Sequence, residues 1–240
     1  MKLSQKQIES IEIKITDFYN LVQEHSDNGV FNDFRTNSFL QRYENYKYET
    51  IENTRSIIDE ITKTTNYGKG IIRELLIDAI GEGYNLVNSF WRNNVRGVLD
   101  DLKGARLSRF EKYLHDLYLD KISNEEFFNY YTSEVSKVYN IIAYILFLKD
   151  SKKFVPLATT TFDSFFNHCG IDFKTTSHCS WENYCEYVAI LDSIRVLLKE
   201  QLGLNVTLID AHSFIWVSES KTWDEWRNRY KKECRVSKNR

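Results

Sequence analysis

Apolar residues recur at spacings of three and four near the start of the chain, as they do along one face of an amphipathic helix. The positions on this face are Ile8, Ile11, Ile15, Phe18 and Val22. The sequence Asp-Asn-Gly at 27–29 then provides a helix stop. We therefore predict a first helix over about residues 8–22 that packs against a partner helix.

The same spacing continues through most of the chain, and it predicts a protein built from helices. Pro156 is the only proline among 240 residues, so the residue that breaks helices most strongly is almost absent. The expected helices cover residues 31–48, 51–63, 72–79, 107–119 and 124–148, followed by a short one that opens at Thr160 and one between Ser180 and Gly203. A short extended segment is expected near residues 205–209, before a brief helix capped by Asp210. The predicted fold class is all-α, a multi-helix bundle.

Residues 141–148 predict the central helix of the core. Their sequence, IIAYILFL, is apolar on every face of a helix, and a helix of this kind is buried on all sides.

Gly81 and Gly83 form a Gly-x-Gly sequence that is weakly similar to a phosphate-binding loop. No strand is expected before these glycines and no Gly-Lys-Ser/Thr follows them, so the features that bind phosphate are missing. We interpret them as a helix break or a close contact between helices.

The composition is that of a globular protein and restricts its electrostatics. Apolar residues make up 42% of the chain and aromatic residues 15%, which is enough for a sizeable core. The formal net charge is −2, from 32 basic and 34 acidic residues, so attraction to nucleic acid or lipid needs a local patch. We expect an N-terminal helical segment over 1–66, a helical module over 67–220 and a basic C-terminal helix or tail over 221–240.

Two features predict a soluble, cytoplasmic protein. The start of the chain, MKLSQKQIES, lacks the apolar core of a secretory signal, and the run 141–148 is far shorter than the roughly 20 apolar residues that cross a bilayer. A reducing compartment disfavours disulfides, so the cysteines are expected to be free thiols. They are Cys169, Cys179, Cys185 and Cys234.

Histidines and cysteines gather within residues 168–185 and form a candidate metal site. Its members are His168, Cys169, His178, Cys179 and Cys185, enough ligands for tetrahedral zinc. The cluster contains no Cys-x-x-Cys pair, and adjacent His-Cys ligands fit poorly around one metal. We therefore favour buried thiols with histidines near helix ends, keep zinc as the alternative, and expect no cofactor.

Arg109 and His115 form a candidate catalytic pair. An arginine six residues before a histidine on a helix resembles the Arg-x(4–6)-His motif of helical HEPN ribonucleases. The resemblance implies that the arginine stabilises phosphate charge and that the histidine transfers a proton. Phe110 stands where the motif usually has a polar residue, and a spacing of six does not place both groups on one helix face. A surface arginine and a histidine at the rim of the core are the other interpretation.

Basic residues gather at the end of the chain. After Thr222 they are Arg227, Arg229, Lys231, Lys232, Arg235, Lys238 and Arg240. Seven basic residues face three acidic ones there, an excess of four positive charges. Such a tail is suited to contacts with DNA phosphates that do not read sequence, and a solvated terminal helix is the alternative.

Several short stretches resemble, in their order and spacing, a helical module of bacterial restriction proteins. They are NLVNSFWR (85–92), LSRFEKYLHDLY, FLKDSKKFVPLATTTFDSFF, GIDF, CSWENY and LIDAHSFIWV, all between residues 84 and 216. The module occurs in McrB-like modification-dependent restriction subunits and in some HNH-type nucleases, beside an ATPase or nuclease domain. This chain has neither a Walker phosphate loop nor an HNH cluster.

These observations predict a non-catalytic helical subunit of a bacterial restriction or anti-phage defence system. The expected partner is DNA, or a nuclease or ATPase subunit of the same system, and no membrane contact is expected. Two alternatives stay open: a helical HEPN-like ribonuclease that uses Arg109 and His115, and a subunit that binds only other proteins.

Overall fold

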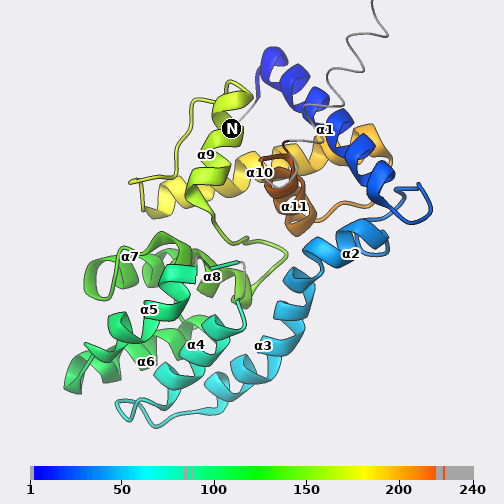
Figure 1. The fold of residues 1–240 in the computed structure, drawn as a ribbon. Helices are drawn as coiled ribbons and strands as arrows, with labels where there is room; N and C mark the ends of the chain where they lie inside the picture. The colour runs from blue at the N-terminus through cyan, green and yellow to red at the C-terminus, as the bar shows by residue number, and fades with distance from the viewer. Residues whose placement is uncertain (1–2, 84–85, 88, 220–223, 225–240) are drawn as a thin grey trace, which may run out of the picture. The chain divides into compact units, whose positions relative to one another are not determined.

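The protein is all-α, as the periodicity predicts (Figure 1). The computed structural model describes residues 3–83, 86–87, 89–219 and 224, and no β-strand occurs among them. The helices of this part are α1 (Gln5–His25), α2 (Ser38–Glu44), α3 (Tyr46–Lys63), α4 (Ile71–Gly81), α5 (Ser89–Asp100), α6 (Gly104–Tyr118), α7 (Asn124–Glu134), α8 (Tyr139–Lys149), α9 (Thr159–His168), α10 (Trp181–Leu202) and α11 (Leu208–Glu219). No helix of the described residues is both long enough and apolar enough to span a bilayer.

The helices form two compact units whose chain segments interleave. The first unit contains residues 1–45, 160–174 and 189–240, and the second contains 46–159 and 175–188. Neither unit begins or ends at the boundary near residue 66 expected from the sequence. Each unit has a core of its own.

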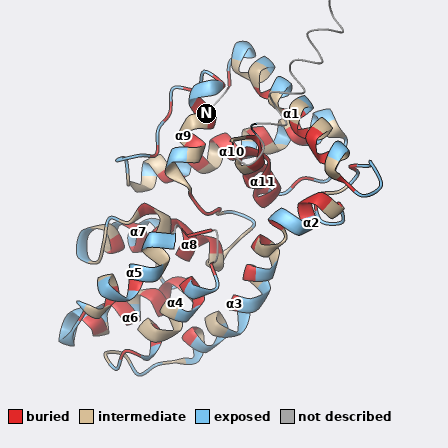
Figure 2. Ribbon diagram, in the orientation of Figure 1, coloured by how far each residue is buried: buried red, intermediate tan, exposed pale blue. Residues whose placement is uncertain are grey.

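The core of the first unit is built around Phe18 of α1. Its ring centroid lies 5.3 Å from that of Phe214 in α11, 5.7 Å from that of Phe31 and 5.8 Å from that of Phe34. Helix α11 is buried along most of its length (Figure 2), and Phe214 is fully buried. Aromatic pairs at these spacings add to the stability that burial of their apolar area provides.

The expected extended segment at 205–209 is shorter in the structure, because α11 already begins at Leu208 and only residues 205–207 lie outside a helix. Its start is fixed by a reciprocal cap. The Asp210 carboxylate accepts hydrogen bonds from the Thr207 backbone N–H (2.8 Å) and hydroxyl (2.7 Å), while the Thr207 hydroxyl accepts one from the Asp210 N–H (3.3 Å). Asp210 therefore supports the cap from inside the first turn instead of being the capping residue.

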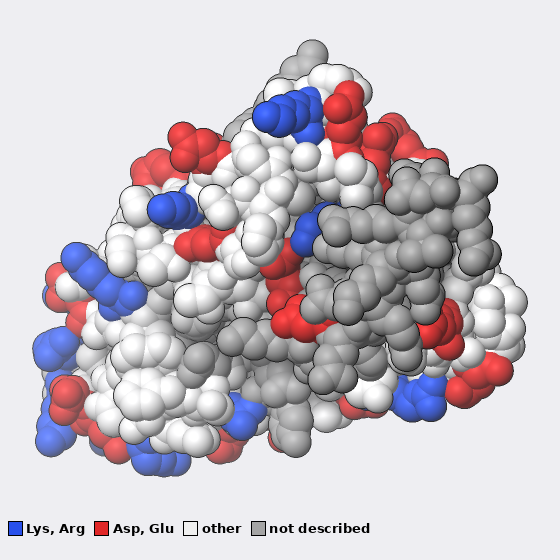
Figure 3. All heavy atoms as spheres, turned by 45° about the horizontal axis from the view of Figure 1, so that its top comes forward, with Lys and Arg blue, Asp and Glu red and all other residues white. Residues whose placement is uncertain are grey.

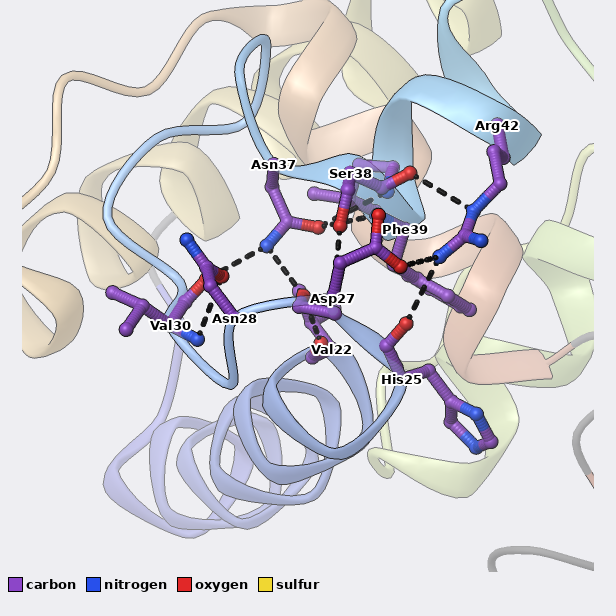
Figure 4. Close-up of polar contacts among 11 residues, drawn as sticks. Val22, His25, Asp27, Asn28, Val30, Asn37, Ser38, Phe39 and Arg42 are labelled. Atoms are coloured by element: carbon purple, nitrogen blue, oxygen red, sulfur yellow. Dashed lines mark hydrogen bonds and ion pairs between the residues drawn. The ribbon is translucent and has the colours of Figure 1, made fainter.

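The expected helix over 31–48 is wrong in its first part, since a loop precedes α2. Asn37 organises this loop (Figure 4). Its Nδ2 donates to Ser26 Oγ (2.6 Å) and to the Val30 carbonyl oxygen (3.0 Å). Its Oδ1 accepts from the backbone N–H groups of Phe39 and Leu40, both at 3.1 Å, which caps α2. One buried amide thus joins the end of α1, the loop and the start of α2.

The second unit has α8 at its centre, as the all-round apolar run 141–148 predicts. Residues 141–147 of α8 are fully buried (Figure 2). The Tyr144 hydroxyl donates to the Ala79 carbonyl oxygen of α4 at 2.8 Å. Gly83 lies against the same ring, because a Cβ atom built there would come within 3.0 Å of Tyr144 Cζ. The close helix contact expected at Gly83 is therefore confirmed.

The single helix expected over 124–148 is two helices, α7 and α8, separated by residues 135–138. The Ser136 N–H bonds back to the Tyr131 carbonyl oxygen, and the Ser136 hydroxyl accepts from the Val138 N–H at 3.2 Å. This local hydrogen bonding by serine competes with helix continuation.

Tyr131 allows a test of how buried hydroxyls contribute to stability. Its side chain is fully buried, and its hydroxyl has no hydrogen-bond partner among the described residues. We expect Tyr131→Phe to leave the free energy of unfolding unchanged or to raise it by up to about 1 kcal/mol, because the hydroxyl has lost its water without gaining a partner.

The control is Tyr144→Phe, which removes a made hydrogen bond and should lower the free energy of unfolding by about 1 kcal/mol. Urea denaturation monitored by circular dichroism compares the two. A larger loss for Tyr131→Phe than for Tyr144→Phe would contradict this account.

Candidate functional site

The structure does not present Arg109 and His115 as a pair. Arg109 is exposed, whereas the His115 side chain is only 3% exposed. Positions six apart on one helix point in different directions, because each residue turns the helix by about 100°. The structure therefore has the other arrangement, with Arg109 on the surface and His115 at the rim of the core.

His115 belongs to a polar cluster between α6 and the turn before α4. Its Nδ1 lies 3.1 Å from the Tyr67 hydroxyl and 3.3 Å from Asp116 Oδ1, and the other oxygen of Asp116 accepts from Lys112. Burial alone would raise the pKa of Asp116, but hydrogen bonds from Lys112 and His115 hold it below its usual value. The imidazole is therefore engaged by protein groups on its Nδ1 side.

Glu111, one turn before His115, binds the backbone around the glycines at 68 and 70. Both glycines have left-handed backbone conformations, with φ of 82° and 81°. The fully buried Glu111 carboxylate accepts from the Gly68 N–H (2.5 Å) and the Arg73 N–H (3.1 Å) at the start of α4. Two backbone N–H groups at and just before this helix end are thus bound by an internal carboxylate.

The residues of the candidate zinc site are divided between the two units. His168 and Cys169 belong to the first unit, and His178, Cys179 and Cys185 to the second. No group of three or more potential ligands comes together within the described residues. Burial raises the pKa of Cys169 and of Cys179 to about 11, so both are neutral thiols at pH 7. The expected free thiols are confirmed for the three cysteines that the structure describes.

His168 instead joins a cluster centred on Glu219 at the end of α11. The Glu219 side chain is 6% exposed, and it binds Lys14 Nζ of α1 at 2.8 Å. Its Oε2 also lies 3.0 Å from Ser164 Oγ and 3.0 Å from His168 Nδ1, both on α9. A carboxylate, an imidazole and a serine thus meet, but the serine donates to the carboxylate and not to the histidine. This is not the geometry that activates a serine nucleophile, in which the serine bonds to the histidine. The cluster instead connects three helices of the first unit, α1, α9 and α11.

The basic residues predicted to bind nucleic acid at the end of the chain lie outside the described residues. They are Arg227, Arg229, Lys231, Lys232, Arg235 and Lys238.

A basic and aromatic surface that the sequence did not predict lies on α6 and α7. Two exposed arginines, Arg106 and Arg109, follow the solvent side of α6, and Tyr113 comes one turn later. The Tyr113 ring stacks on that of Tyr130 of α7, with centroids 4.1 Å apart and an angle of 25° between the planes. We call these four residues the Arg–Tyr surface. Because Tyr113 and Tyr130 are 17 positions apart in sequence, only the packing of α6 on α7 brings them together.

The Arg–Tyr surface is a local feature within a mixed charge distribution. On the face drawn in Figure 3, lysine and arginine side chains alternate with aspartate and glutamate. The whole chain carries a formal charge of only −2. Binding of a polyanion would therefore depend on particular side chains and not on a broad positive field.

Comparison of the chain with models of known protein families, with curated proteins and with solved structures found no match.

Proposed function

We propose that the chain is a non-catalytic helical subunit of a bacterial restriction or anti-phage defence system, and that it binds DNA. One observation carries the DNA-binding part of this proposal. Helix α6 and its N-cap present four exposed basic side chains at every third position: Lys103, Arg106, Arg109 and Lys112. Positions three apart are neighbours on a helix surface, so each side chain lies beside the next in a row that winds around the helix.

Most of the charge in this row is available to an anion. Lys112 is paired with Asp116. The other three form no ion pair with any described residue, and Arg106 donates only to the neutral backbone carbonyl of Glu134. Phosphate oxygens are the natural acceptors for such side chains, and these contacts give affinity without sequence specificity.

The non-catalytic and defence parts rest on two further arguments. The possible catalytic pair, Arg109 and His115, is divided between an exposed and a buried position. The stretch LSRFEKYLHDLY, which resembles part of the restriction module, lies within residues 107–118 and covers most of α6. A partner nuclease or ATPase is the second kind of partner that the resemblance suggests.

Fluorescence anisotropy with a labelled duplex at two salt concentrations tests this function. We expect the intact chain to bind and the affinity to fall steeply with salt, because each phosphate contact contributes about 0.9 to the slope of log Kd against log salt concentration. A version that ends at Lys221 lacks the basic tail and measures its share of the slope.

The control is Arg55→Ala, an exposed arginine of α3 outside the basic row, which should bind like the intact chain. If the intact chain binds no nucleic acid, DNA binding is wrong. Co-purification with nuclease and ATPase subunits then tests the protein-binding alternative.

A further inference from the structure

The two rings of the Arg–Tyr surface are arranged as a stacked pair at the edge of the α6–α7 packing. Their centroid separation of 4.1 Å is short for an aromatic pair, and both side chains are partly exposed. No other aromatic ring of the described residues is in stacking contact with either of them. Because both side chains are partly exposed, part of the stack is accessible to solvent.

The hydroxyls of Tyr113 and Tyr130 belong to partly exposed side chains, unlike that of the fully buried Tyr131 in the same unit. Neither hydroxyl bonds to a described residue, and neither is buried without a partner. Other tyrosine hydroxyls of the unit donate to protein acceptors, as do those of Tyr139, Tyr144, Tyr184 and Tyr187. Both hydroxyls of the pair are thus available to a ligand, because no described residue bonds to them.

The two arginines lie close enough to the rings to act on them. Burial raises the pKa of Tyr130 to about 12, against the opposing effects of Arg109 and Arg106, while Glu134 raises it further. The Arg106 Nη2 atom donates to the Glu134 carbonyl oxygen at 2.8 Å, which holds this guanidinium beside the end of α7. Two positive charges and one negative charge therefore act on the Tyr130 hydroxyl.

We propose that the Arg–Tyr surface binds single-stranded nucleic acid, with a base stacked on the tyrosine pair and the adjoining phosphates held by Arg106 and Arg109. The inference rests on the proposed function and names its substrate class. In a duplex the bases already stack on one another and their faces are closed to a protein ring. A single strand exposes base faces, and aromatic rings beside basic side chains are the common way of binding it.

The test compares binding of the intact chain and four variants to a labelled 20-nucleotide single strand and to a duplex of the same length. A single-stranded RNA of the same sequence, measured beside the DNA strand, shows which of the two nucleic acids the surface binds more tightly. We expect Tyr113→Ala to weaken single-strand binding by about tenfold or more, since stacking of one base contributes about 1–3 kcal/mol. Tyr113→Phe keeps the ring and should stay within about threefold of the intact chain.

Arg109→Ala should weaken single-strand binding and lower the magnitude of its salt slope by about 0.7, the contribution of one phosphate contact. Arg55→Ala, outside the surface, should change neither. Far-UV circular dichroism shows whether each variant is folded, and Arg109→Ala changes an exposed side chain whose loss should not unfold the unit.

The outcomes separate this inference from the proposed function. If the intact chain binds but Tyr113→Ala and Arg109→Ala bind single strands as tightly as it does, the Arg–Tyr surface is not the site and only the inference is wrong. If both variants weaken duplex binding as much as single-strand binding, the substrate class is wrong. If the intact chain binds neither form of nucleic acid, the inference and the DNA-binding function are both wrong.

Discussion

Replacing Asn37 by alanine should lower the free energy of unfolding by about 3 kcal/mol. The variant removes the cap of α2, which contributes about 1 kcal/mol. It also removes the donor to the buried Ser26 Oγ, and a buried polar group without its partner costs about 1–3 kcal/mol, while the more exposed Val30 carbonyl oxygen can bond to water instead. Urea denaturation measures the change.

Two further variants show which of these hydrogen bonds accounts for the loss of stability in Asn37→Ala. Asn37→Asp keeps an acceptor for the cap but loses both donors, so its stability should lie between that of alanine and the parent. Asn28→Ala removes one hydrogen bond at an exposed position of the same loop and should cost less than about 1 kcal/mol. Equal losses at Asn28 and Asn37 would show that the buried amide does not organise this loop.

Gly83→Ala should lower the free energy of unfolding by about 2 kcal/mol. The new methyl group would lie 3.0 Å from Tyr144 Cζ and 3.0 Å from the Ile80 carbonyl oxygen, so a neighbour has to move. Overpacking of this kind typically costs about 1–3 kcal/mol. Displacement of the tyrosine ring would also strain its hydrogen bond to Ala79.

Gly81→Ala is the matched control, two residues away in the same sequence motif. A Cβ atom at Gly81 meets no atom within 4 Å, and the residue is helical. Alanine there should stabilise the protein by about 0.5–1 kcal/mol, because it restricts the unfolded chain more than glycine does. Thermal unfolding of the two variants should therefore shift in opposite directions, and a destabilised Gly81→Ala would contradict the reading of this pair.

The sequence predicted the elements in which local pattern and tertiary environment agree. Residues 141–148 are apolar on all sides, and α8 is buried on all sides. Ser180 and Gly203 bound α10 as expected: the Ser180 hydroxyl accepts from the Asn183 N–H at 3.2 Å, and Gly203 has a φ of 68°. Capping and termination signals of this kind act over a few residues and can be read without the rest of the fold.

The errors arose where buried apolar residues lie outside regular structure. Phe31 and Phe34 are buried against Phe18 from a loop, so their spacing was mistaken for that of a helix. A local signal was present in Asp33, whose carboxylate accepts from the N–H groups of residues 35 and 36 and forms a turn. Ser136 gave a similar signal between α7 and α8.

The candidate site was less predictable than the fold because its residues meet only through packing. Arg109 was singled out for its spacing to His115, whereas its partners in the proposed site are a neighbouring arginine and two tyrosines. The stacking of Tyr113 on Tyr130 depends on the register between α6 and α7, which no local pattern specifies. Periodicity predicts which side of each helix is polar, and the contact between two helices then selects the groups that meet.

The interleaving of the two units has a consequence for synthesis and for dissection of the protein. The first unit needs α1 from residues 5–25 and α11 from residues 208–219, so its core cannot form until residue 219 has left the ribosome. The second unit waits for residues 175–188. No single cut in the chain releases either unit whole. To study one unit alone, its separate segments have to be joined to one another by new linkers.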